Sequence, residues 1–238
     1  MCCFLLFSIK DVNIDYTVYT DGNSAKVKQI DEDFEKYSGK NLLFLNLNNV
    51  KKELNDNPYY EIVSVEKDFP NVLSIKIKER RKAFYIFDDT NVYETTKDGI
   101  VLSVCKNENF SNYEDRQMIY LTLDGVSVSN ASLGKKISTS ADDLMLSTFN
   151  MATAVNLNDC INKIKVEKAV EKEWVFLYTY TGTIIQIIDA LDDGQAKIEK
   201  AFSIYNEDID DFEKTRKYIV VLKNNEGEIQ GYWTESCY

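Results

Sequence analysis

Apolar and polar side chains alternate along two neighbouring stretches, residues 60–67 and 72–79, with the period of a strand that has one buried face. The segment Phe69-Pro70-Asn71 between them has the composition of a turn. The pattern therefore predicts an antiparallel hairpin with one apolar and one charged face. Its inward-facing residues are expected to be Val63, Val65, Leu73, Ile75 and Ile77.

Residues 24–38 and 42–57 instead repeat apolar side chains at the three- and four-residue spacing of amphipathic helices. Gly39 follows the first helix, where a left-handed C-cap residue is favoured, and Pro58 ends the second because proline cannot continue a helix. The two apolar stripes are Val27, Ile30, Phe34 and Tyr37, then Leu43, Leu47, Val50 and Leu54. With a strand starting near residue 9, the order is strand–helix–helix–strand–strand, a small α+β module with both helices on one face of the sheet.

The chain after residue 81 predicts a mostly antiparallel β domain with flanking helices. Residues 163–169, 173–180 and 183–188 have strand composition, and Asp98-Gly99 is a strong hairpin signal. A helix is expected over residues 140–155, where Ser140 and Asp143 have the spacing of a capping box, and another over 192–209. The predicted fold class is α+β, with an anchor remnant at residues 1–8, a module at 9–81 and the β domain at 82–238.

The last predicted hairpin offers a candidate binding edge. Its first strand is apolar on both faces and is expected to lie inside the sheet, whereas its second strand ends the predicted β domain. A strand at the edge of a sheet leaves backbone N–H and C=O groups that a foreign strand can pair with. The candidate partner-binding residues are Tyr218, Val220, Ile229, Gln230, Tyr232 and Trp233. The alternative is that Tyr232 and Trp233 pack inward.

Composition narrows the possible functions. The 238 residues include no histidine, which removes His-dependent triads and metal sites, and a net charge of -11 argues against binding a nucleic-acid backbone. The five cysteines form no CxxC pair, so neither a disulfide framework nor a zinc site is expected. Adjacent acids such as Asp88 and Asp89 are typical of turns and caps, so no catalytic residue, cofactor, metal or small-molecule substrate is predicted.

Two charged segments are candidate binding surfaces. Alternation places Lys76, Lys78 and Arg80 on one side of a strand, either to protect the exposed sheet from aggregation or to contact a membrane or an acidic partner. The acidic segment 189–213 begins with a partial EF-hand pattern, but Leu191 and Lys200 occupy two ligand positions. That segment is predicted to be a turn and a solvated helix, or a patch that faces a partner.

The N-terminal run MCCFLLFSI is apolar but shorter than the roughly 20 residues that span a bilayer. It also lacks the basic region and cleavage site of a signal peptide. It is interpreted as the end of a membrane helix, with a buried first strand as the alternative. Cys2 and Cys3 are expected to belong to that membrane segment, and acylation is the other possibility.

Together the residues of the first module resemble the POTRA domain of the cell-division proteins FtsQ and DivIB. The matches at fixed spacing are Phe7, Ile9, Val12, Gly39, Asn41, Leu42, Phe44, Leu47, Val50, Leu54, Asn57, Pro58, Tyr59, Val63, Val65, Pro70, Asn71, Leu73, Ile75, Ile77, Glu79, Arg80 and Ala83. Lys82 and Thr122 stand where the family often has proline. The resemblance is specific over residues 7–102 and looser beyond.

The resemblance implies a non-enzymatic divisome scaffold in the cell membrane. Such a protein has one membrane helix, and most of the chain lies on the extracytoplasmic side. Its implied partners are FtsB/DivIC-like and FtsL-like division proteins, bound by strand addition at the end of the β domain. Two rivals remain: another POTRA-bearing secretion or assembly factor, although only about 135 residues follow the single module, and a hydrolase that uses carboxylates.

Overall fold

The chain divides into two compact units, Met1–Arg81 and Lys82–Tyr238. The computed structural model describes residues 6–17, 34–55, 57–111, 118–154, 160–170, 172–210, 213–215 and 217–235. Residues 24–33 of the predicted helix over 24–38 lie outside these described residues, as do residues 1–5 of the N-terminal run. Each unit has its own apolar core and is described by itself.

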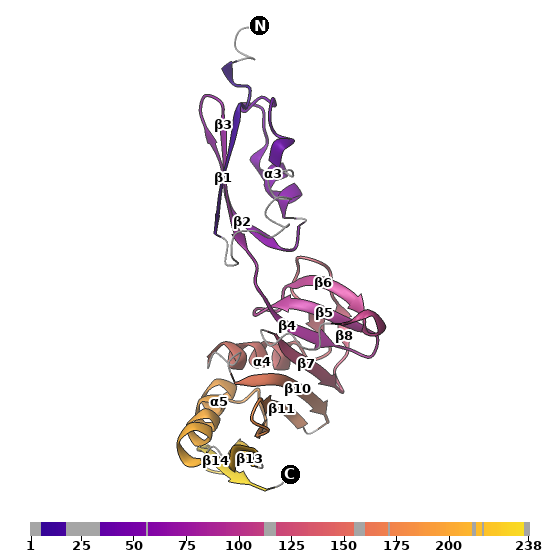
Figure 1. Ribbon diagram of the computed structural model, residues 1–238, viewed down its shortest axis with the longest axis vertical. Helices are drawn as coiled ribbons and strands as arrows, with labels where there is room; N and C mark the ends of the chain where they lie inside the picture. The colour runs from indigo at the N-terminus through magenta and orange to yellow at the C-terminus, as the bar shows by residue number, and fades with distance from the viewer. Residues whose placement is uncertain are drawn as a thin grey trace. The chain divides into compact units, whose positions relative to one another are not determined.

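The first unit is a three-stranded sheet with a helix on one face (Figure 1). Its elements are β1 (Asp11–Thr17), α3 (Leu47–Leu54), β2 (Tyr60–Asp68) and β3 (Val72–Glu79). The strand order is β1-β3-β2, with β1 parallel and β2 antiparallel to β3. Phe34 and Tyr37 from the expected first helix are buried with Ile9 in the core of this unit. The predicted hairpin β2–β3 is confirmed.

Helix α3 begins later than its apolar stripe predicts. The side chain of Asn46 accepts hydrogen bonds from the backbone N–H groups of Asn48 and Asn49, at 3.0 and 3.3 Å, and so caps the helix there. Val50 and Leu54 are buried as predicted. Leu43 is not on the stripe: it precedes the cap and is exposed, so its predicted burial is wrong.

A second correction concerns strand β2. Leu73, Ile75 and Ile77 of β3 are buried as expected, but Val63 of β2 is exposed. The register between β2 and β3 shifts between Ile62 and Ser64, so a β-bulge inserts one extra residue there. Because a bulge reverses the facing of the residues around it, Val63 turns to solvent.

The second unit is built on a nine-stranded mixed sheet with the order β14-β13-β12-β11-β10-β7-β4-β5-β6. Five of its neighbouring pairs are antiparallel, and the pairs β4–β7, β7–β10 and β12–β13 are parallel. The strands are β4 (Lys82–Phe87), β5 (Asn91–Thr96), β6 (Val101–Lys106), β7 (Ile119–Asp124), β10 (Ile161–Ala169), β11 (Lys172–Thr179), β12 (Ile184–Ile187), β13 (Tyr218–Lys223) and β14 (Ile229–Thr234).

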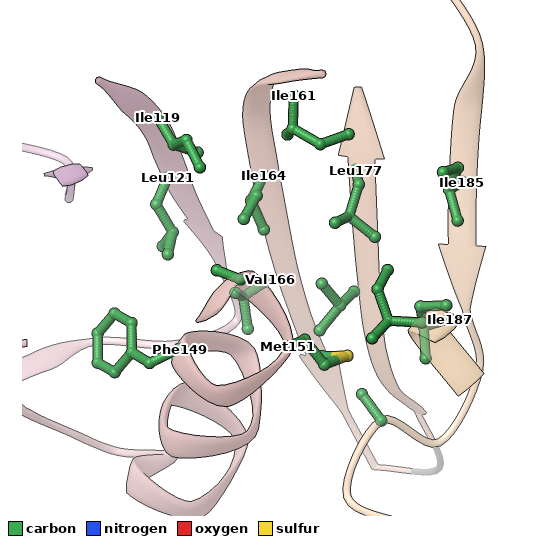
Figure 2. Packing of buried hydrophobic residues seen from close by; sticks show 14 of the residues in the cluster. Ile119, Leu121, Phe149, Met151, Ile161, Ile164, Val166, Leu177, Ile185 and Ile187 are labelled. Carbon is green, nitrogen blue, oxygen red and sulfur yellow. The ribbon is translucent and has the colours of Figure 1, made fainter. Parts of the chain in front are cut away.

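Helices α4 (Asp142–Ala154) and α5 (Gly194–Ser203) pack against one face of this sheet. Figure 2 shows Phe149 and Met151 of α4 at the sheet face that carries the row Leu121, Ile164, Leu177 and Ile185, which comes from four neighbouring strands. Short elements complete the unit: β8 (Val128–Asn130), β9 (Ser138–Thr139), η1 (Asn107–Asn109), η3 (Ile204–Asp208) and η4 (Glu213–Thr215). The described structure is therefore the predicted α+β class.

The cap of α4 differs from the predicted capping box by one residue. The Asp142 carboxylate accepts the backbone N–H of Thr139, and the Thr139 hydroxyl accepts the N–H of Ala141 at 3.1 Å. Ser140, the predicted cap, instead accepts the N–H of Ser127 through its hydroxyl at 3.0 Å. Thr139 with Asp142 and Ser140 with Asp143 have the same three-residue spacing, so the sequence alone does not show which pair caps the helix.

The partial EF-hand pattern forms a turn held by lysines. The Lys197 ammonium, fully buried, donates to the carbonyls of Ile188 and Asp189, both at 2.9 Å, and this burial lowers its pKa. Lys223 pairs with the carboxylates of Asp192 and Asp193 at 2.7 and 2.6 Å. Among the described residues no cluster of three or more acidic, His or Cys side chains could hold a metal ion.

Candidate functional site

Strand β14 forms one edge of the nine-stranded sheet, as the sequence predicts. It pairs only with β13 among the strands that the structure describes. The hairpin that joins them is closed by Asn224, whose N–H donates to the Glu228 carbonyl at 2.9 Å and whose side chain accepts the N–H groups of Glu226 and Glu228, both at 2.9 Å. Gly227 supplies the positive φ of 84° that this turn needs.

The hairpin closure fixes which backbone groups of β14 face β13. In an antiparallel pair, hydrogen-bonded and non-hydrogen-bonded residue pairs alternate. Because Asn224 and Glu228 form a hydrogen-bonded pair, the residues of β14 in step with them also bond to β13. These residues are Gln230, Tyr232 and Thr234, which lie opposite Leu222, Val220 and Tyr218.

The other residues of β14 direct their backbone N–H and C=O groups away from β13. They are Ile229, Gly231 and Trp233. Strand β13 shows the same alternation. The Val221 carbonyl, which belongs to the residue opposite Gly231, accepts the Ile188 N–H on the β12 side at 3.0 Å and therefore points away from β14. The outer rim of β14 therefore presents the backbone N–H and C=O groups of three alternate residues, at the spacing that a further β-strand needs for pairing.

The opposite edge of the same sheet, β6, is partly covered by the chain itself. The N–H of Val101 donates to the Lys135 carbonyl at 2.9 Å, and its carbonyl accepts the Gly134 N–H at 2.8 Å. The N–H of Ile137 donates to the Gly99 carbonyl at 2.8 Å, and Ile100 forms a bridge with Lys136. Native sheets commonly protect their edges in this way. The cover reaches only the start of β6, at Val101, whereas no comparable backbone contact is found on the outer side of β14 among the described residues.

The side chains of β14 point to the two faces of the sheet. Ile229 packs against the core on the helix side, and Gly231 allows close approach of the Ile204 side chain. Trp233, on the same side, is 43% exposed and has the Lys217 ammonium 4.0 Å from its ring centroid. Tyr232 faces the other side and is 37% exposed. Both aromatic rings are thus half available to a partner at the edge.

Of the other predicted site residues, Gln230 is exposed on β14, Tyr218 is half-buried on β13 and Val220 is fully buried. Strand β13 is an interior strand, parallel to β12 and antiparallel to β14, as its two apolar faces predict. Val220 therefore supports the edge from within the sheet and offers no surface of its own.

A row of side chains with aromatic residues at both ends, which we call the aromatic row, runs from Tyr232 to Phe176 on the face opposite α4 and α5, and it was not predicted from the sequence. The register aligns Tyr232, Val220, Gln186 and Phe176 across four strands. Lysines flank this row: the Lys172 ammonium lies 4.3 Å from the centroid of Trp174, Lys163 5.4 Å from Tyr178, and Lys165 5.6 Å from Phe176. The signal in the sequence was the alternation of three aromatics with Val175 and Leu177, which makes both faces of β11 apolar.

None of the helices among the described residues has the length and apolar character needed to cross a bilayer. Residues 7–80 match the family model of the POTRA domain of FtsQ type. Much of the chain is also similar to curated relatives called cell division protein DivIB. The chain is therefore similar to FtsQ/DivIB proteins, and its residues 7–80 match their POTRA domain.

The similarity to DivIB proteins extends well past the POTRA domain. The DivIB of Clostridium acetobutylicum is 29% identical over 199 residues, which cover 83% of this chain and 73% of the relative. That of Clostridium tetani is 29% identical over 201 residues, covering 84% and 72%. A DivIB of Clostridium botulinum strain Hall is 26% identical over 153 residues, covering 63% and 53%.

The expected basic stripe lies on the sheet of the POTRA unit. Lys76 and Lys78 are exposed, but the register places them beside Asp15 and Glu61 on the neighbouring strands. Arg80 is half-buried, donates to the Pro58 carbonyl at 3.1 Å, and has its pKa lowered by burial. The stripe is therefore a mixed-charge face, and Arg80 ties the end of β3 to the segment before β2.

Proposed function

We propose that this protein is a non-enzymatic divisome scaffold that binds a partner division protein by strand addition at β14. The partner contributes one extended segment, whose backbone pairs with the rim residues of β14. Tyr232 and Trp233 contact the partner's side chains from the two faces of the sheet. The partners expected from the family are FtsB/DivIC-like and FtsL-like proteins, outside a membrane that the N-terminal segment reaches.

One observation supports this proposal above the others: the backbone of β14 alternates between inward and outward hydrogen bonding. Main-chain hydrogen bonds supply affinity in strand addition, and alternate side chains supply specificity. The rim offers three outward sets, and exposed aromatic residues, which are common in binding hot spots, flank it. The cover over the start of β6 shortens that edge, which favours β14 for a partner strand.

Residue-resolved amide exchange tests the proposed pairing directly. On addition of the extracytoplasmic segment of DivIC from the same organism, the amide protons of Ile229, Gly231 and Trp233 are expected to slow in exchange. The amide protons of Gln230 and Tyr232 already bond to β13, so their exchange should change much less. Uniform protection of all five, or protection elsewhere with none at these residues, would count against strand addition at this edge.

A matched pair of variants separates the backbone contribution from the side chain. Ile229→Pro removes one outward N–H, whereas Ile229→Ala shortens the same side chain and keeps that N–H. One hydrogen bond contributes about 0.5–1.5 kcal/mol, so Ile229→Pro should bind DivIC about 2–10-fold more weakly than Ile229→Ala. Equal affinities of the two variants, with both folded by circular dichroism, would exclude a backbone contact at Ile229.

A further inference from the structure

The end of the POTRA unit at which the chain enters is unusually apolar on its surface. Among the described residues of this unit, four of the six large hydrophobic residues that are exposed lie in the segments that form this end. They are Leu6, Leu43, Phe44 and Phe69; the other two are Tyr16 and Val63. Phe44 is 75% exposed and Phe69 57%, so two phenyl rings face outward from one end of a small domain.

Backbone and ring contacts join these segments into one surface, which we call the entry tip (residues 6–10, 40–45 and 67–71). The N–H of Leu42 donates to the Phe7 carbonyl at 2.7 Å, and the rings of Phe7 and Phe69 meet edge to face with centroids 6.0 Å apart. The N–H of Lys10 donates to the Asn71 carbonyl at 3.0 Å. In Figure 1 the turn between β2 and β3 lies at the same end of this unit as the start of β1.

The local structure holds the apolar residues outward. Leu42 is fully buried, but the next residue, Leu43, turns away from the core and donates its N–H to the Asn41 side chain at 3.0 Å. The Lys67 ammonium donates to the Leu43 carbonyl at 3.0 Å, which fixes this turn from the hairpin side. A sequence of four apolar residues, 42–45, is thus divided between the core and the tip by polar contacts.

Charge and chain continuity point to the occupant of this surface. Lys10 and Lys40 are exposed at the tip and Lys67 is half-buried there, in a chain whose net charge is -11. The one acid within these segments is Asp68, and Asp11 and Glu66 lie just beyond them. The apolar run that begins the sequence leads directly into the tip through Leu6 and Phe7. Apolar and aromatic residues bordered by lysine are the composition that binds the interface of a bilayer with anionic lipid.

We infer that the entry tip lies in the interface of a lipid bilayer, with Phe44 and Phe69 inserted among the headgroups. This inference rests on the proposed function, because it requires the N-terminal segment to be membrane-attached. It adds a second attachment: the folded domain itself contacts the lipid surface, which would fix the orientation of the POTRA domain relative to that surface. Residues at such an interface sit about 5–10 Å deep, at the boundary of headgroups and acyl chains.

Tryptophan depth probes test the inference on the full chain. Phe44→Trp and Phe69→Trp are mixed with vesicles of phosphatidylcholine and phosphatidylglycerol in equal parts, made with and without bromine on the acyl chains. The control is Val63→Trp, equally exposed at 58% on the bulge of β2 but outside the tip. The emission of Trp174 and Trp233, the native tryptophans, is subtracted using the unsubstituted protein.

The expected result is a blue-shifted emission and quenching by the brominated lipid about twofold or more stronger for both tip probes than for Val63→Trp. Bound protein whose tip probes stay as unquenched as the control would overturn the inference and leave the proposed membrane attachment intact. Failure of the chain to float with vesicles would overturn both. A dimer in analytical ultracentrifugation that Phe69→Asp dissociates, with no quenching, would assign the tip to a second copy of the chain and overturn lipid contact.

Discussion

Gly231 allows the edge strand β14 to lie directly against the segment that follows α5. A methyl group at this position would be 2.5 Å from Ile204 Cδ1, 3.3 Å from Val221 Cγ2 and 3.4 Å from Lys200 Cγ. Carbon atoms in contact prefer about 3.5–4.0 Å, so Gly231→Ala requires a displacement of about 1 Å at Ile204. Ile204 is buried, so its side chain has little room to turn away.

The size of the effect follows from these distances. Overpacking costs about 1–3 kcal/mol, and replacing glycine by alanine at an unstrained φ returns about 0.4–1 kcal/mol through the unfolded chain. Gly231→Ala alone is therefore expected to lower the free energy of unfolding by about 1–2 kcal/mol. Ile204→Val alone removes Cδ1 and costs about 0.5–1.5 kcal/mol.

The double variant should lose less unfolding free energy than the sum of the losses in the two single variants. In the double variant the new methyl group occupies the space that Cδ1 has left, so the free energy of unfolding should fall by only about 0–1 kcal/mol. The coupling between the two sites is then about 1–2 kcal/mol in the favourable direction. Urea unfolding followed by tryptophan fluorescence measures it, because both tryptophans, Trp174 and Trp233, belong to the second unit.

A control cycle uses a glycine of the same hairpin. A methyl group at Gly227 would meet nothing within 4 Å, so Gly227→Ala combined with Ile204→Val should be additive to about 0.5 kcal/mol. Additivity of Gly231→Ala and Ile204→Val would refute the close contact and, with it, the packing of the helix-side face of β14 against Ile204.

Three further outcomes follow from single contacts. The Thr139 N–H lowers the pKa of Asp142 below its usual 3.8, so the stabilisation by this carboxylate is present above that pH and lost as pH falls through the lowered pKa. Asp142→Asn keeps an acceptor oxygen but removes the charge at the start of α4, so it should cost about 0.3–1 kcal/mol near neutral pH, and urea unfolding should show this difference vanishing in acid. Gln186 is buried with neither amide atom hydrogen-bonded among the described residues, so Gln186→Met should leave the thermal midpoint unchanged or raise it, and a clear drop would indicate a hydrogen-bond partner. Gly125 has φ 68° and would place a methyl group 2.0 Å from the Lys168 carbonyl oxygen, so Gly125→Ala should lower the thermal midpoint well beyond Gly227→Ala, by about 2–12 °C; equal midpoints would refute the clash.

Local patterns in the sequence predict the local structure of this protein well. The hairpin β2–β3, the helices α4 and α5 and the terminal hairpin follow from periodicity and turn residues. The errors arise where one residue changes the facing or the register. The bulge at Val63 and the cap at Thr139 are examples, because in each case neighbouring residues of similar chemistry could occupy the same structural position.

Long-range pairing sets the limit of what the sequence reveals. The edge position of β14 was predictable from its place after an interior strand, but the aromatic row was not. That row depends on the parallel pairing of β12 with β13 and the antiparallel pairing of β11 with β12, which bring Phe176, Gln186 and Val220 side by side. The alternation along β11 indicates that both of its faces are apolar, but it does not reveal which distant strands lie beside it.

The strand order has a consequence for when this protein becomes competent to assemble. Strand β14 comes after all eight other strands of its sheet in the sequence, and its inner neighbour β13 is placed by the crossover through α5. A ribosome therefore finishes every other strand before the proposed docking rim exists. Unfinished or prematurely terminated polypeptides lack the rim, so a partner that requires it selects for chains synthesised through β14.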